Sequence, residues 1–556
     1  MKDKLINCIS KICYLFPIIV TFVVSKCNLL YYIQSDDYQM NYISMGGISG
    51  SPDEHLVFIK SIYGYITRFL YNINSNVNWF GLIYIILIIV FTYTLLLVLS
   101  LHFDNRVALV LSLVFEIISI CWLTFTTIAY FSVAVGLIAV IEGVIINDEK
   151  IKKYILLILG VLLIVCGFAL RSTAMVTGTL LALPVLIISA NKLIRVKTFY
   201  LVLIGIVLLI GVVQIVDHSS YESKMWSEYK AFNNARAQVV DYPIEEYKDN
   251  EVAYKKISMS KNDVDCMKNW IFADKEIFST NKLEQVAKST KLTTRYNLKI
   301  PRILKDLLTI KETYIALIIA ILLVLLCSSK KQKIMIALQI LFLYGLVTSL
   351  IIMNRSLPRV YIPVFVIGVL YLFFIYLLGR KNEDIAINKK KKVFMCISLL
   401  SIAISTAIYI NMYKDKVSDR KIAETNFKDL RQYIINHKDL AFVSNDIFNV
   451  MNYQSVMDVK TQKPYINLMN IGHWNSYDEV YYKQVNKYNL SYKDRLLIDI
   501  AKDKNVLFID SSINKTPRMI NTEIFIREHT NKNIKVIPIK TFRKEKSILY
   551  SVGFTR

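Results

Sequence analysis

Long uninterrupted apolar runs are the feature of this 556-residue sequence that most constrains its fold. A run of about 17 or more apolar residues can cross roughly 30 Å of hydrocarbon as a helix. A helix is expected because the backbone in lipid must satisfy its own hydrogen bonds. The predicted spans are residues 12–33, 78–101, 107–124, 127–146, 154–170, 174–191, 198–216, 312–328, 333–352, 361–379 and 393–412. The sequence therefore predicts an α-helical polytopic membrane protein with about eleven transmembrane helices.

Basic residues are concentrated in alternate connections between these spans, which predicts the orientation of the chain. With the N-terminus inside, the cytoplasmic connections carry Arg106; Lys150, Lys152 and Lys153; Lys192, Arg195 and Lys197; Lys330, Lys331 and Lys333; and Arg380, Lys381 and Lys389–Lys392. The short outer connections near 124–127 and 172–173 are nearly uncharged, apart from Arg171. The positive-inside rule then predicts a multi-pass cell-membrane protein with a cytoplasmic N-terminus. Much of the net charge of +24 lies in these connections, so we expect no nucleic-acid partner.

Three polar segments fall outside the membrane in this arrangement. They are the loop at 34–77, the loop at 217–312 and the segment from 413 to the C-terminus. The last alternates strand-like runs at 440–443, 506–509 and 534–539 with helical stretches at 418–436 and 492–502. This alternation predicts a small C-terminal extracytoplasmic α/β domain at 413–556, after a transmembrane domain at 1–412.

The first outer loop contains five ionisable residues that could form a site. Asp36 and Asp37 directly follow the first span, and Asp53, Glu54 and His55 precede an amphipathic stretch at 55–71 that is predicted to lie in the membrane interface. The carboxylates could take a proton from an attacking hydroxyl. Asp36 and Asp37 could also hold a divalent metal such as Mg²⁺ or Mn²⁺. Alternatively, the pair is an ordinary solvated helix end, and residues 52–54 cap the next helix.

Three arginines lie at the outer edges of predicted spans, where the positive-inside rule disfavours them. Arg171 ends the fifth span, and Arg355 and Arg359 lie between the ninth and tenth spans. The guanidinium group offers a fixed fork of donors that suits phosphate oxygens. These residues are therefore candidates for contact with a lipid phosphate at the outer leaflet. Snorkelling, or pairing with a carboxylate such as Asp36, would also explain them.

Two outer segments combine aromatic and polar residues in a way that resembles a sugar-binding surface. The segments are FNNARAQVVDYP at 232–243 and NIGHWNSYDEVYY at 470–482. Buried aromatic faces of helices would explain the same composition, and His473 and Trp474 fit a structural role as well as a catalytic one.

The order of these features resembles the GT-C superfamily of membrane glycosyltransferases. The shared features are a first span, an acidic pair at the outer surface, an interfacial helix, further spans and a C-terminal extracytoplasmic domain. The resemblance implies a polyprenyl-phosphate or polyprenyl-diphosphate sugar donor, with Asp36 or Asp37 as general base. It also implies that Arg171, Arg355 and Arg359 contact the lipid phosphate. The chain is also similar to multi-spanning proteins of Gram-positive bacteria, which implies a cell-envelope setting.

The leading functional expectation is an inverting glycosyltransferase that acts on an envelope glycan or glycolipid acceptor. An O-antigen-type polysaccharide polymerase or ligase is the alternative, and it would place its catalytic residues in the loop at 217–312. A lipid-linked saccharide transporter or flippase is a third reading, although the sequence lacks repeated spans and paired broken helices. A purely structural envelope protein is a fourth, and it would leave Asp36, Asp37, Arg171 and Arg359 unexplained.

Overall fold

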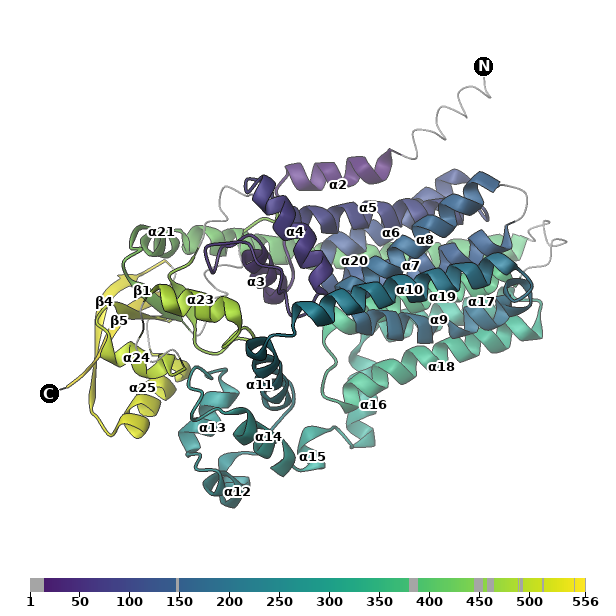
Figure 1. The fold of residues 1–556 in the computed structure, drawn as a ribbon. Helices are drawn as coiled ribbons and strands as arrows, with labels where there is room; N and C mark the ends of the chain where they lie inside the picture. Colours follow the sequence, from purple (N-terminus) through teal and green to yellow (C-terminus); the bar gives the residue numbers. More distant parts are fainter. Residues whose placement is uncertain are drawn as a thin grey trace.

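The computed structural model in Figure 1 has two parts. One is a helical bundle, and the other is a polar body formed by the three polar segments at 34–77, 217–312 and 413 onward. The structure describes residues 15–146, 150–379, 389–444, 454–457, 465–488, 490, 494–512, 515–544 and 546–555. Within the helix that begins at Lys389, residues 389–405 are described by their backbone alone. Arg380 and Lys381, which belong to a predicted cytoplasmic connection, lie outside the described residues, as do the side chains of Lys389–Lys392.

Each predicted span coincides with a helix of the bundle. The helices are α2 (Phe16–Lys26), α5 (Trp79–Leu99), α6 (Asn105–Cys121), α7 (Phe125–Ile145), α8 (Lys150–Leu170), α9 (Ser172–Leu193), α10 (Lys197–Ser220), α17 (Lys311–Leu326), α18 (Lys330–Ile352), α19 (Pro358–Leu378) and α20 (Lys389–Asn426). Helix α7 lies at the centre, because nearly its whole surface is buried against α5, α8, α9 and α19.

Within the residues that the structure describes, fewer helices are long and apolar enough to cross a membrane than the sequence predicts for the whole chain. The predicted spans 12–33 and 393–412 include residues or side chains outside that description. Seven helices of the described chain are long and apolar enough: α5, α7, α8, α9, α10, α18 and α19. The number rises to eight if the segment Leu292–Thr309, which contains α16 (Ile300–Thr309), forms one span with α17, with a bend of 75° between them. Helices α2, α6 and α17 have 11, 17 and 16 residues, fewer than the roughly 20 residues that a membrane-spanning helix usually has. The first predicted span is shortened because the chain leaves the helix at Cys27.

The three polar segments predicted to lie on one side of the membrane are found together at one end of the bundle (Figure 1). The turns with basic residues 150–153, 192–197 and 330–333 lie at the opposite end. This arrangement agrees with the alternation expected from the loop charges. The proposed boundary at 412/413 falls inside α20, which runs without a break from the bundle into the polar body.

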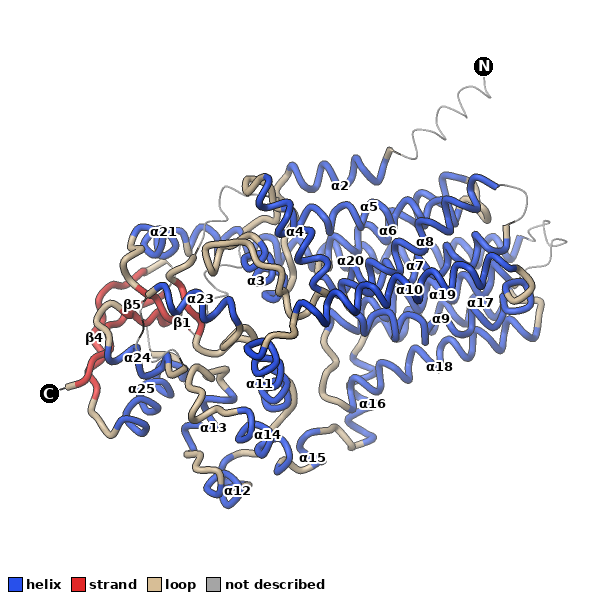
Figure 2. Tube along the Cα trace, viewed as in Figure 1, coloured by secondary structure: helices blue, strands red, loops and turns tan. Residues whose placement is uncertain are grey.

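The polar body contains one five-stranded mixed sheet at its far end (Figure 2). Its strands are β1 (Ala441–Ser444), β2 (Leu468–Asn470), β3 (Val506–Asp510), β4 (Ile534–Phe542) and β5 (Ser547–Phe554), in the order β2-β1-β3-β5-β4. Strands β2, β1 and β3 are parallel, whereas β5 pairs antiparallel with β3 and β4. Helices α21 (Lys428–Asn436), α23 (Glu479–Lys487), α24 (Leu496–Lys502) and α25 (Pro517–Thr530) accompany the sheet. The prediction of a small C-terminal domain with strands and helices is confirmed.

The loop at 217–312 packs onto this domain. Its elements are α11 (Lys224–Val240), the 3₁₀ helix η1 (Tyr247–Asp249), α12 (Glu251–Lys256), α13 (Lys261–Lys268), α14 (Thr280–Ser289), α15 (Leu292–Arg295) and α16. Its apolar residues share one core with the C-terminal domain, including Phe232, Phe272 and Phe525. The backbone N–H groups of Phe272 and Ala273 both donate to the Ile471 carbonyl, at 2.8 and 2.9 Å.

The first outer loop folds into α3 (Ser35–Ser44) and α4 (Ser61–Ile73). The chain turns back sharply between them at Gly46 and Gly50, whose positive φ angles favour glycine. Helix α4 begins six residues later than the predicted stretch at 55–71. Asp217 accounts for the start of α4, because it accepts a hydrogen bond from the Ser61 N–H and pairs with Lys60. The exposed face of α4 carries Tyr65, Ile66, Phe69 and Ile73, as expected of an interfacial helix.

Candidate functional site

A polar cavity of about 600 Å³, called the arginine cavity below, lies where the bundle meets the polar body. Helix α3, the start of α9 and the turn before α19 supply one side, and α11, the segment 470–474 and α25 supply the other. Its charged and hydrogen-bonding residues are Ser35, Asp36, Arg171, Asn233, Asn234, Arg236, Asp241, Trp270, Asn354, Arg355, Arg359, Asn470, His473, Trp474 and Arg518. Asp36 and the three predicted outer arginines are thus brought to one cavity.

Asp36 faces this cavity from the first turn of α3. One carboxylate oxygen, Oδ1, accepts a hydrogen bond from the Trp474 indole at 3.1 Å, and Oδ2 lies 3.8 Å from Arg359. Burial raises the pKa of Asp36, and the Arg359 charge and the Trp474 hydrogen bond oppose that rise. Because the side chain keeps 19% of its exposure, it can meet a ligand in the cavity.

Asp37 points away from the cavity into the protein interior. Its side chain is fully buried, and Oδ1 accepts hydrogen bonds from the Phe125 N–H at 2.8 Å and the Tyr84 hydroxyl at 3.0 Å. Asp37 thereby binds the first N–H of α7. Burial raises the pKa of Asp37 to about 8, against the effect of the Phe125 hydrogen bond. Asp36 and Asp37 both lie in the first turn of α3, and their side chains point in different directions.

The predicted arginines reach the cavity from two turns of the bundle. Arg171 donates to the Thr126 and Thr173 hydroxyls at 2.8 and 3.1 Å and lies over the Phe125 ring. Arg355 pairs with Asp241 at 2.8 Å.

Arg359 donates to the Gln34 side chain at 2.5 Å and lies near Asp36. The arginines are therefore held in place by protein contacts while still lining the cavity.

The polar body contributes two further arginines that the sequence did not single out. Arg236 comes from α11 and Arg518 from α25. Two segments whose composition resembles a sugar-binding surface, 232–243 and 470–482, both line this cavity, and the first of them contains Arg236. Nothing in the sequence near Arg518 distinguishes it from a residue on an ordinary helix surface.

Aromatic and imidazole groups line the cavity where the loop at 217–312 meets the segment 470–474 of the C-terminal domain. Gly472 is required there, because a Cβ at this position would lie 1.4 Å from the Trp270 carbonyl oxygen. Trp270 itself has φ +60°, a left-handed conformation that is rare for a bulky residue. His473 is almost fully buried, and burial together with the Arg236 charge lowers its pKa well below the usual value. The His473 imidazole is therefore neutral at physiological pH.

Asp53, Glu54 and His55 form a separate cluster beside a cavity of about 250 Å³. Their ligand atoms lie within 4.8 Å of one another, a spacing that could hold a metal ion. However, Asp53 pairs with His55 at 2.7 Å and with Lys483 at 3.0 Å, and the other His55 nitrogen contacts the Ser220 carbonyl. Burial would raise the pKa of Asp53, but these hydrogen bonds lower it overall. The cluster thus joins the first loop to α10 and α23, and it does not line the arginine cavity.

Two groups of the described residues bring at least three potential metal ligands together, and neither includes Asp36 or Asp37. Besides the cluster at 53–55, the described chain has one such group, formed by Asp263, Glu528 and His529. Asp36 faces the cavity and Asp37 faces the interior, so their two carboxylates do not converge on one point.

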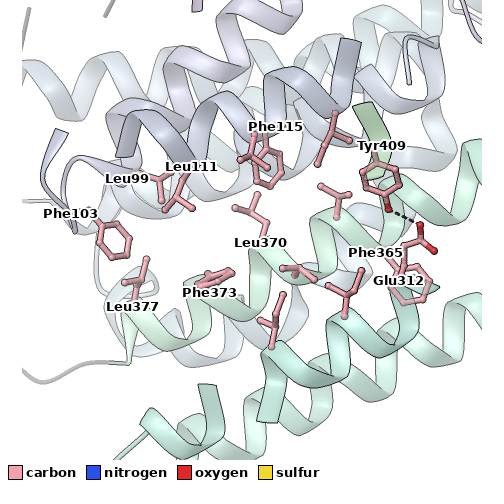
Figure 3. A pocket seen from close by; sticks show the side chains of 16 residues that line it. Leu99, Phe103, Leu111, Phe115, Glu312, Phe365, Leu370, Phe373, Leu377 and Tyr409 are labelled. Atoms are coloured by element: carbon pink, nitrogen blue, oxygen red, sulfur yellow. Dashed lines mark hydrogen bonds between the residues drawn. The ribbon is translucent and has the colours of Figure 1, made fainter. Parts of the chain in front are cut away.

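An apolar cavity of about 90 Å³ lies among the bundle helices α5, α6, α17, α19 and α20 (Figure 3). At one end the Tyr409 hydroxyl donates to Glu312 at 2.6 Å. Both residues also line a neighbouring cavity of about 290 Å³, which reaches Pro358 beside Arg359. The two apolar cavities share Glu312, Ile315 and Tyr409, and Pro358 of the second lies between Leu357 and Arg359 of the arginine cavity in the sequence.

No protein-family model, curated protein or solved structure matches this chain. The fold and the site define a helical protein with spans long enough for a membrane and an arginine-rich cavity at one end of its bundle.

Proposed function

We propose that the chain is a membrane glycosyltransferase that uses a polyprenyl-phosphate-linked or polyprenyl-diphosphate-linked sugar. The observation that carries this proposal is the shared cavity, in which one partly exposed carboxylate, Asp36, lies among several arginines. A sugar transfer from a lipid phosphate requires a base for the acceptor hydroxyl and cations for the leaving phosphate. The acceptor is an envelope glycan or glycolipid.

In the proposed reaction Asp36 removes the proton from the acceptor hydroxyl as its oxygen attacks the anomeric carbon. The new carbon–oxygen bond forms as the bond from the anomeric carbon to the donor phosphate oxygen breaks, so the configuration inverts. The electron pair of the broken bond goes to the phosphate, where Arg171 and Arg359 stabilise the added negative charge. The raised pKa of Asp36 suits a base that accepts and then releases a proton.

The apolar cavities support a lipid donor. A hydrocarbon chain lying among α5, α6, α17 and α19 would be shielded from water, and the hollow at Pro358 would bring its phosphate end toward Arg359. The hydrocarbon tail of the lipid would thus contact apolar surface, and its phosphate head would contact a charged surface.

One observation favours the polymerase or ligase alternative. The loop at 217–312 contributes Asn233, Arg236 and Asp241 to the same cavity, as that alternative expects. The two functions share the donor chemistry and differ in the acceptor. Asp241 pairs with Arg355, which leaves Asp36 as the better placed base.

The proposal predicts that donor use depends on the guanidinium forks of Arg171 and Arg359. Replacing either by Ala should lower kcat/KM for a lipid-phosphate sugar by about 10- to 100-fold, as expected for a lost charged hydrogen bond of roughly 1.5–3 kcal/mol. Lys variants should recover part of the activity, since they keep the charge but lose the fork. Arg302→Ala, on the exposed surface of α16, is the matched control. Wild-type activity in both Ala variants would refute phosphate recognition by this cavity.

A further inference from the structure

Arg236 is a buried cation with an unused donor at the wall of the polar cavity. Its side chain is 3% exposed. The Nε and Nη2 groups both donate to the Asn233 side-chain oxygen, at 3.0 and 2.8 Å. The Nη1 group is buried and has no hydrogen-bond partner among the described residues. Leaving a charged donor buried and unpaired is costly, so its retention in a cavity wall points to a ligand.

The surroundings of Arg236 hold the guanidinium rigidly, and Arg236 forms no ion pair with a carboxylate of the described residues, although Asp241 and Asp36 lie near enough to act on its charge. Asn233 fixes one edge of the fork, and the Trp270 ring lies 5.4 Å from the guanidinium carbon. The two acidic residues of the cavity form their ion pairs with other arginines: Asp241 with Arg355, and Asp36 with Arg359. His473, on the same wall, is neutral because burial and the Arg236 charge lower its pKa.

The charges of the cavity exceed what one phosphate group would balance. Five arginines and two aspartates line it. After the two ion pairs are counted, Arg171 and Arg236 remain as positive charges that form no ion pair with a carboxylate of the described residues. Arg171 belongs to the bundle, and Arg236 belongs to the polar body. The excess positive charge is therefore divided between these two parts of the molecule.

We infer that the cavity binds a ligand with two adjacent anionic groups, a diphosphate, with the second group held by Arg236. This inference rests on the proposed function for the identity of the lipid-linked donor. A sugar joined to a lipid through one phosphate carries a single negative charge, whereas one joined through a diphosphate carries two. The second charge matches the excess on the wall of the polar body. The free Nη1 donor of Arg236 supplies its hydrogen bond.

The test is a binding measurement on the full chain in detergent, with inorganic phosphate and inorganic pyrophosphate as probes. The wild-type protein should bind pyrophosphate at least tenfold more tightly than phosphate. Arg236→Gln should remove this preference and leave phosphate affinity unchanged, while Arg359→Gln should weaken both. Arg236→Lys, which keeps the charge, should retain part of the preference. Arg527→Gln, on the exposed face of α25, is the control.

Equal affinity of the wild-type protein for the two probes would overturn the inference without any variant that could misfold. An unchanged preference in a folded Arg236→Gln protein would overturn it too. Competition by polyprenyl diphosphate at lower concentration than free pyrophosphate would identify a lipid source, whereas equal competition would identify the free anion. A pyrophosphate preference without sugar transfer would uphold the diphosphate site and reject the proposed glycosyltransferase. Sugar transfer without the pyrophosphate preference would uphold the proposed glycosyltransferase and reject the diphosphate site.

Discussion

The neighbouring residues Asp36 and Asp37 have different surroundings, and those surroundings determine what each can do. Asp36 meets the cavity, whereas Asp37 is enclosed by Tyr84 and the start of α7. A carboxyl group with a pKa near 8 is largely protonated at neutral pH, so Asp37 acts as a neutral hydrogen-bonding group inside the protein.

Asp37 should make the protein less stable as the pH rises. The folded chain retains a proton on this group up to about pH 8, whereas the unfolded chain releases it near pH 4, so this contribution to stability is lost between these values. Asp37→Asn stays neutral and can still accept from the Phe125 N–H. Its melting temperature should therefore rise relative to wild type as the pH increases from 5 to 8.

The control for this experiment is Glu284→Gln on the exposed side of α14, which should follow the wild-type curve at every pH. A constant difference between Asp37→Asn and wild type across the range would show that Asp37 is ionised in the folded protein.

Among the elements, the segment 470–474 is the one that completes the site. It lies directly after β2 and carries Gly472, His473 and Trp474 into the cavity wall. Its position depends on the contact with Trp270, where only glycine leaves room for the carbonyl oxygen. The site therefore depends on docking between the loop at 217–312 and the C-terminal domain.

Gly472→Ala should separate these two segments. The added methyl group meets a backbone oxygen that cannot rotate away, so we expect a loss of roughly 1–3 kcal/mol in stability and a weaker anion site. Thermal unfolding and pyrophosphate binding would measure the two effects. Gly553→Ala in β5, which meets no atom within 4 Å, should behave like wild type. A Gly472→Ala protein with unaltered stability and binding would show that the contact is dispensable.

Local patterns predicted the elements better than they predicted the site. The strand-like runs at 440–443 and 506–509 lie within one residue of β1 and β3, because short apolar runs bounded by polar residues are a local signal. The outer arginines could be predicted because they violate a topological rule. Arg236 violates no rule: it is one residue of an ordinary helix, and only tertiary packing brings it to the cavity that Asp36 also lines. The separation of the cluster at 53–55 from the cavity is equally invisible in the sequence.

For the molecule as a whole, all three polar segments lie at one end of the bundle. The orientation of the bundle in the membrane therefore decides on which side the cavity lies. If the loop charges set the topology, a cysteine at Asn281 should react with a membrane-impermeant thiol reagent from outside the cell, and one at Arg195 should not. Both positions are exposed, and both variants would be made in a chain without its native cysteines. Labelling of the Arg195 position alone would place the cavity on the cytoplasmic face.

In the proposed function, a sugar leaves a lipid phosphate in the arginine cavity. The most direct measurement is sugar transfer from polyprenyl-phosphate-linked and polyprenyl-diphosphate-linked donors in vesicles that contain wild-type, Asp36→Asn or Asp37→Asn protein. Asp36→Asn should lose about 10²- to 10⁴-fold in rate at unchanged protein level, since it keeps the shape and removes the base. Asp37→Asn should retain activity. Full activity in a folded Asp36→Asn protein would contradict the account.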